Sequence, residues 1–99
     1  RQYWIPDEEI QILEKNATNG DKNSAFKLYQ YHMFVSLDQD LEFKWLEIAA
    51  KNGHPIAQSN LADLFFTQGN KEKAIFWAKK AYRNGAKLPD ELKILININ

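Results

Sequence analysis

The sequence predicts an all-α protein of about six helices, arranged as antiparallel pairs that stack into a short α-solenoid. One observation is a helix end followed at once by a helix start, because Gly53 suits a left-handed residue after one helix and Pro55 suits the first turn of the next. A period in the low thirties that holds two helices is typical of an α-solenoid. That period is the second observation, since residue types recur 32 positions apart, matching Trp45 with Trp77, Ala49 with Ala81, Gly53 with Gly85 and Ala25 with Ala57.

The first three helices follow from local signals. Residues 7–18 form the first, because acidic side chains at its start suit the positive end of a helix dipole and apolar residues recur at helical spacing. Asp21 or Asn23 is expected to cap a second helix that stops near residue 35. Asp38 or Asp40 is expected to cap a third, which closes at the glycine at position 53.

The remaining helices repeat this scheme over residues 55–67 and 71–84, and a last one opens at Pro89 as a cap over the end of the stack. The tail Ile94–Ile98 is apolar and β-branched, so we expect it to fold back onto the preceding pair, with packing against another chain as the alternative. The chain is one domain of four parts, namely an N-terminal helix (1–18), two repeats (21–53 and 54–86) and a C-terminal capping helix (87–99).

These residues resemble the Sel1-like repeat, a relative of the tetratricopeptide repeat. The family's first-helix pattern is matched by Ala57, Leu61-Ala62 and Phe65, and its second-helix pattern by Ala74, Trp77, Ala81 and Gly85 in one copy and by Trp45, Ala49-Ala50 and Gly53 in the other. Two departures are the absence of a Gly-rich loop between the two helices of a pair and Glu42 at a position that is small in the family. The resemblance implies a right-handed solenoid whose first helices line a concave groove.

Composition narrows the function classes. The chain of 99 residues is 44 % hydrophobic and has 13 aromatic side chains, which favours a packed domain. Zero net charge weakens the case for a nucleic-acid partner, and no apolar run reaches the roughly 18 residues that a membrane span needs. With no cysteine, a disulfide framework and a thiolate zinc site are excluded. The chain begins with Arg1 rather than Met, which is compatible with a mature or trimmed product, so a bacterial periplasm and cytoplasm both stay open.

The net charge conceals two poles. Residues 1–50 hold five Lys and Arg against nine Asp and Glu, a net charge of −4, whereas residues 51–99 hold eight against four, a net charge of +4. Such poles can steer a partner or pair two copies head to tail, and a solvated outer face of the helices is the alternative interpretation.

No catalytic, cofactor or metal constellation is predicted. His32 and His54 fall in different repeats, where a buried position and a helix cap account for them. Asp38 and Asp40 lack the longer ligand series of a calcium loop, so helix capping explains them better. Without paired His, Cys or a carboxylate dyad, we expect the protein not to be an enzyme.

The remaining candidate is a protein-binding groove. Side chains of the first helices that point away from the Ala, Leu and aromatic anchors are predicted to face the partner, namely Lys27, Tyr31, Phe34, Ser59, Asp63 and Phe66. Phe34 and Phe66 match at 32 residues and are either aromatic anchors for a partner or packing between repeats. Tyr31 and Asp63 match likewise and would offer polar recognition.

The function expected from this pattern is a non-enzymatic module, a monomer or weak dimer, that binds a protein partner in its concave groove. Some bacterial proteins that the chain resembles are immunity proteins that neutralise a secreted toxin effector, and others are adaptors or regulators. The alternatives are therefore a generic adaptor or scaffold, or a structural protein that self-associates through its apolar C-terminal tail.

Overall fold

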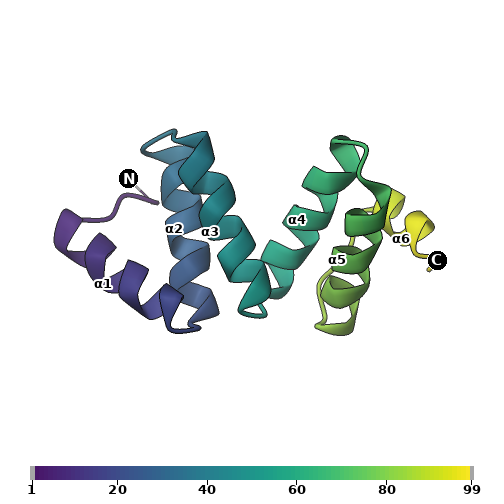
Figure 1. The fold of residues 1–99 in the computed structure, drawn as a ribbon, viewed down its shortest axis with the longest axis horizontal. Coiled ribbons are helices and arrows are strands. Elements are labelled where there is room, and N and C mark those ends of the chain that lie inside the picture. The colour runs from purple at the N-terminus through teal and green to yellow at the C-terminus, as the bar shows by residue number, and fades with distance from the viewer. Residues whose placement is uncertain (1, 99) are drawn as a thin grey trace.

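The computed structural model describes residues 2–98, and within them it contains six α-helices and no β-strand. Helices α2 to α5 run alternately up and down (Figure 1). The most extensive packing joins α2 to α3 and α4 to α5, so these four helices form two pairs, with α1 before them and α6 after them. The molecule measures 44 × 23 × 21 Å along its principal axes. The helices are α1 (Asp7–Thr18), α2 (Lys22–Phe34), α3 (Gln39–Lys51), α4 (Pro55–Thr67), α5 (Lys71–Arg83) and α6 (Asp90–Leu95). The predicted all-α class is confirmed.

Side chains that precede the helices hold their first turns. Asp21 accepts a hydrogen bond from the backbone N–H two residues later at 3.2 Å, and Asp38 accepts one from three residues later at 3.1 Å. The first of the two predicted caps is therefore the cap in each case. His54 and Asn70 accept equivalent bonds at the starts of α4 and α5. Each bond satisfies a backbone donor that has no partner inside the helix.

The two pairs differ in the turn between their helices. Four residues (35–38) join α2 to α3, whereas three (68–70) join α4 to α5. The longer turn includes Leu37 at φ 57°, where the shorter one has Gly69 at φ 81°. Because of the extra residue, α2 and α4 begin 33 residues apart, although α3 and α5 begin 32 apart. The period of 32 is therefore wrong for the first helices, in which Ala57 corresponds to Ser24 rather than to Ala25.

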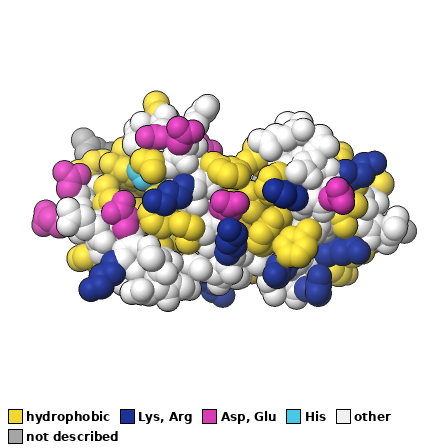
Figure 2. All heavy atoms as spheres, in the orientation of Figure 1, with side chains coloured by type: hydrophobic (Ala, Val, Ile, Leu, Met, Phe, Trp, Pro, Cys, Tyr) yellow, Lys and Arg dark blue, Asp and Glu magenta, His cyan; other side chains and the backbone are white. Residues whose placement is uncertain are grey.

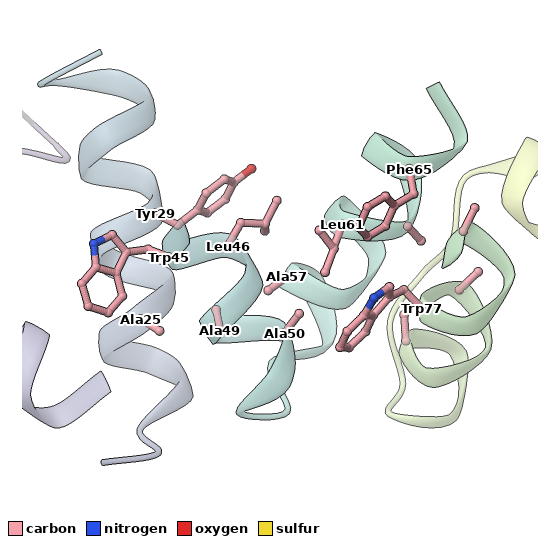
Figure 3. Packing of buried hydrophobic residues seen from close by; sticks show 14 of the residues in the cluster. Ala25, Tyr29, Trp45, Leu46, Ala49, Ala50, Ala57, Leu61, Phe65 and Trp77 are labelled. Atoms are coloured by element: carbon pink, nitrogen blue, oxygen red, sulfur yellow. The ribbon is translucent and has the colours of Figure 1, made fainter. Parts of the chain in front are cut away.

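The core combines many alanines with larger apolar side chains, among them the rings of two tryptophans. Ala49 and Ala81 have no exposed surface, and Trp45 and Trp77 are 2 % and 9 % exposed, as their spacing predicted. Figure 3 shows Trp45 on the side of α3 that faces α2, and Trp77 lying between α4 and α5. Small residues let the helices approach closely, while each of the two rings buries a large apolar surface.

Polar side chains link each pair to the helix before it. Asn52, at the end of α3, donates through Nδ2 to the backbone carbonyl of Ala17 in α1 at 2.9 Å. At the end of α5, Asn84 donates to Oε1 of Gln58 at 2.9 Å, and Nε2 of Gln58 donates to the carbonyl of Ala50 in α3 at 3.0 Å. Ala17 and Ala50 are both the last residue but one of their helices. The carbonyls at these two equivalent positions are thus bonded differently. Ala17 accepts directly from an asparagine, whereas Ala50 is linked to an asparagine through the buried Gln58.

The C-terminal segment folds onto the second pair. Leu88, Leu92 and Ile96 are buried in the same core cluster as the two tryptophans, in agreement with the expected fold-back of the tail. Ile94 is 71 % exposed, so one apolar side chain of the tail stays at the surface. None of the helices described in residues 2–98 has the length and apolar character required to cross a membrane.

Candidate functional site

The outer face of α4 carries the main candidate site. His54 caps the helix and Pro55 occupies its first turn, where the missing N–H costs nothing. Leu61 on the inner face is fully buried. On the opposite face Ile56 is 54 % exposed and Asp63 is also exposed. Two surface hollows lie along this outer face, one on each side.

The first hollow, called here the inter-pair hollow, lies between α4 and the preceding pair. Its volume is about 470 Å³. Figure 3 shows the Tyr29 ring and Leu46 on the side of the first pair that faces α4. In the space-filling view, the outline of the molecule is indented between the two pairs (Figure 2). Three helices contribute to its wall, with Tyr29 and Met33 from α2, Glu42 and Leu46 from α3, and Asn60, Asp63, Leu64 and Thr67 from α4.

The polar groups of the inter-pair hollow are acidic or hydrogen-bonding. Neither Glu42 nor Asp63 forms an ion pair with a residue of the described chain, and no Lys or Arg lines the hollow. The Tyr29 hydroxyl accepts a hydrogen bond from Nδ2 of Asn60 at 3.3 Å. Burial raises the pKa of Tyr29, the Asn60 bond opposes this, and the charge of Glu42 adds to the rise. The hydroxyl therefore keeps its proton at neutral pH, and the hollow suits a cationic group that can also accept or donate hydrogen bonds.

The second hollow, called here the slot, lies beside the N-terminal half of α4 and is mostly apolar. Its volume is about 660 Å³, within the range of sites that hold small ligands or side chains. Burial and the nearby charge of Lys22 lower the pKa of His54, so its ring is neutral at pH 7. Since Nδ1 accepts the N–H of Ala57 at 3.3 Å, the ring proton is on Nε2. The slot is lined by His54, Pro55, Ile56, Ser59, Asn60, Gly85, Ala86, Lys87, Leu88 and Pro89.

The predicted groove residues of α2 contact other parts of the chain. The Phe34 ring stacks on Tyr3 with centroids 4.4 Å apart, although Phe34 is still 53 % exposed. Nζ of Lys27 pairs with Glu9 of α1 at 3.5 Å. Tyr31 is half-buried and meets the ring of His32 edge-on. These side chains therefore have partners within the chain, and this part of the predicted groove is partly covered.

Two expectations about the predicted groove residues need correction. Ser59 is only 7 % exposed, because it lies on the flank of α4 at the floor of the slot, so its side chain does not point away from the protein. Phe34 is the last residue of α2 and corresponds to Thr67, whereas Phe66 corresponds to Met33, so the two phenylalanines are not equivalent. Phe66 is 37 % exposed. Of the six predicted residues, Asp63 lines the inter-pair hollow and Ser59 lines the slot.

Charge is distributed unevenly over the surface. Figure 2 shows Asp and Glu side chains mainly over the half that holds α1 to α3, and Lys and Arg gathered around α5. On α5, Nζ of Lys80 lies 5.0 Å from the centroid of the exposed Phe76 ring. The two predicted poles are thus separate regions of the surface.

In residues 2–98 no three His, Asp or Glu side chains are grouped closely enough to hold a metal ion.

Comparison with known proteins gives one named relative. No family model matches the sequence, and no solved structure matches it. The chain is 31 % identical over 90 residues to YibG, an uncharacterized protein of Escherichia coli (strain K12). The similarity covers 84 % of this chain but 59 % of YibG, so the chain matches less than two thirds of that protein's length.

Most of the residues that line the two hollows were not predicted as site residues from the sequence. Tyr29, Glu42 and Asn60 line the inter-pair hollow together with Asp63, and Lys87 lines the slot. A signal was present in the chain, because aligning α2 with α4 at 33 residues superimposes their buried positions. Which residues of α3 face α4 depends on the angle between the pairs, and no spacing in the sequence indicates that angle.

Proposed function

We propose that this chain is a non-enzymatic binding module of the Sel1-like, tetratricopeptide-related kind, a short right-handed solenoid that holds a partner protein along the outer face of α4. The repeated architecture supports this, since α2 to α5 have 13 residues each and recur at 32 or 33 positions. In the family that the sequence resembles, the first helices of successive pairs line the binding groove. The inter-pair hollow is lined by side chains of both first helices, α2 and α4, which supports this role.

The observation that carries the proposal is the pair of unpaired carboxylates in the inter-pair hollow. Glu42 and Asp63 come from different helix pairs and share one hollow, which no Lys or Arg of the described residues lines. A Lys or Arg side chain of a partner would make charge-assisted hydrogen bonds there, which are stronger than bonds between neutral groups. Met33, Leu46 and Leu64 provide apolar wall for the stem of that side chain.

Partner affinity tests this role. The tagged chain is used to isolate a partner from its native cells, and the affinity of the purified pair is then measured by calorimetry for the double variant Glu42→Gln/Asp63→Asn. We expect binding to weaken about tenfold or more, because a buried partner cation would lose both counter-charges. The control is Asp7→Asn/Glu8→Gln on the exposed start of α1, which removes the same charge elsewhere. Equal affinities for the hollow variant and the wild type would contradict the proposal.

Within this proposal the narrower role is that of an immunity protein, which neutralises a secreted bacterial toxin effector in the periplasm or the cytoplasm. The small size of the domain and its two charged poles are compatible with it, and YibG is itself a bacterial protein. The activity of the isolated partner decides between the roles. A toxic hydrolase whose turnover falls to background when the chain binds indicates immunity, whereas a partner with unchanged activity indicates a generic adaptor.

Self-association is the second candidate, favoured by Ile94. This side chain is 71 % exposed on α6, at the end of the described chain opposite α1. Sedimentation velocity over a hundredfold range of concentration separates a monomer from a weak dimer. If the tail forms the contact, the sedimentation coefficient rises with concentration and Ile94→Gln removes the rise.

A further inference from the structure

The two helix pairs differ at one equivalent place on their surfaces. In the first pair, the fifth residue of α2 is Phe26, and its ring stacks on His54, the residue that follows the turn after α3. The centroids are 4.0 Å apart and the planes are inclined by 12°. This aromatic pair bridges the first half of α2 and the start of α4.

In the second pair, two small residues stand at the same positions. The fifth residue of α4 is Ser59, and Ala86 follows the turn after α5. The backbone is the same at both turns. His54 N–H donates to the carbonyl of Ala49 at 3.0 Å, and Ala86 N–H donates to that of Ala81 at 3.0 Å. The second pair therefore has a hydroxymethyl and a methyl group where the first has two rings.

The surface hollows reflect this difference. The hollow beside α2, which Phe26 and His54 help to line, has a volume of about 370 Å³. The slot beside α4 has about 660 Å³ and a mostly apolar wall that includes Ile56 and Leu88. An apolar space of this size next to well-packed helices favours a flat apolar group, because it would regain the contacts that the missing rings would make.

The rim of the slot carries groups that suit a peptide side chain. Ser59 is 7 % exposed as a residue, and its hydroxyl makes no hydrogen bond within the described chain, so it stays open to the slot. Lys87 forms no ion pair with the described residues. An ammonium group beside an aromatic face is attractive, and Lys80 already takes such a position over Phe76 in this protein.

We propose that the slot binds an aromatic side chain of a partner protein, in the place that the rings of Phe26 and His54 hold in the first pair. The proposal extends the proposed function, since the ring belongs to the partner that the outer face of α4 holds. The slot supplies an aromatic anchor, and the inter-pair hollow on the other side of α4 supplies the charged contact.

A titration followed by ¹H–¹⁵N NMR tests the slot without the partner. The probe is N-acetyl-phenylalaninamide, and the control is N-acetyl-leucinamide, which has the same polar groups and no ring. We expect the probe to shift the amides of Ser59, Ala86 and Lys87 with a dissociation constant on the order of a millimolar, as is usual for a fragment of this size. The leucine compound is expected to bind about fivefold more weakly or worse, because it lacks the planar face. Equal binding of the two, or shifts that lie elsewhere, would overturn the proposal.

Two variants exploit the difference between the pairs. Ser59→Phe with Ala86→His rebuilds the aromatic pair in the slot, and we expect at least a tenfold loss of probe binding. Phe26→Ser removes one of the two rings beside α2 and leaves the face of His54 free for the probe. The probe is therefore expected to gain a second site there, which keeps the proposal testable if the filled variant folds poorly. A filled slot that binds the probe as before, or an opened place that never binds it, would contradict the proposal.

Other occupants have distinct signatures. Slot amides that shift with protein concentration alone would identify a second copy of the chain as the occupant and overturn the proposal. Failure of the proposed function is seen separately, as an unchanged partner affinity in the Glu42→Gln/Asp63→Asn variant while the probe still binds the slot.

Discussion

The buried Gln58 relay gives the sharpest prediction about stability. Gln58 is 1 % exposed and receives one hydrogen bond from Asn84 and donates one to the carbonyl of Ala50. Gln58→Leu keeps a similar volume and removes both bonds. The Ala50 carbonyl still accepts the N–H of Gly53 at 3.1 Å, and Asn84 is exposed enough to turn to water. The substitution therefore leaves no group of the relay wholly without a partner.

The magnitude follows from these contacts. Two net hydrogen bonds stabilise by about 1–3 kcal/mol, and burial of a leucine in place of an amide returns part of this. We expect the free energy of unfolding to fall by about 1–2 kcal/mol. For a chain of 99 residues the unfolding entropy is about 0.2 kcal/mol per kelvin, so the melting temperature should drop by roughly 5–10 °C.

Urea unfolding followed by tryptophan fluorescence and circular dichroism measures the loss. Asn84→Ala and the double variant complete a thermodynamic cycle, in which a coupling of about 0.5 kcal/mol or more is expected for residues in one network. A Gln58→Leu variant as stable as the wild type would refute the stabilising role of the relay, and a coupling near zero would show that Gln58 and Asn84 do not act as one network.

Three further predictions concern single positions. Trp77→Ala should cost about 3–5 kcal/mol of stability in thermal melts, since the Trp77 side chain is only 9 % exposed. The neighbouring Phe76 is 54 % exposed, so Phe76→Ala should cost under about 1 kcal/mol. Similar losses for the two variants would show that Trp77 is not a core residue. Leu37→Gly should stabilise by about 1 kcal/mol, because a leucine at φ 57° is strained and its side chain is 73 % exposed, and a lower urea midpoint would contradict this. Burial lowers the pKa of both His32 and His54 below the ordinary 6.5. Below about pH 6.5 the unfolded chain therefore binds more protons than the folded chain, and the free energy of unfolding should fall as the pH drops. Urea midpoints that stay constant between pH 7.5 and 5.5 would exclude this linkage.

Much of the helical framework could be predicted from the sequence because its signals are local. A cap such as Asp21 or Asp38 acts on the next turn of its own helix, and the left-handed residue Gly53 ends its own. The start of α1 and the bounds of α4 follow from charges and a proline that act within one turn. Short-range physical causes of this kind leave a readable pattern.

The site was predicted less well because its determinants are not local. One inserted residue at Leu37 shifts the register of the first helices to 33, which the repeat of Trp45 and Trp77 at 32 conceals. Ser59 reads as a polar outer residue, yet it is buried on the flank of α4. Gln58 gave no sequence signal, since a buried glutamine is recognisable only once the two groups it bridges are in place.

The asparagines that end α3 and α5 have a consequence for cooperativity. Each one ties the last turn of its own helix to a carbonyl near the end of a helix in the preceding layer, directly for Asn52 and through Gln58 for Asn84. Stacked repeats are held together by nearest-neighbour terms, and those terms are usually apolar and tolerant of small sliding movements. A directional hydrogen bond is not, because it weakens steeply when donor and acceptor move out of line. Each asparagine therefore adds a directional contact between the end of its own helix and the preceding layer, and this contact opposes sliding or rotation of one layer against the other.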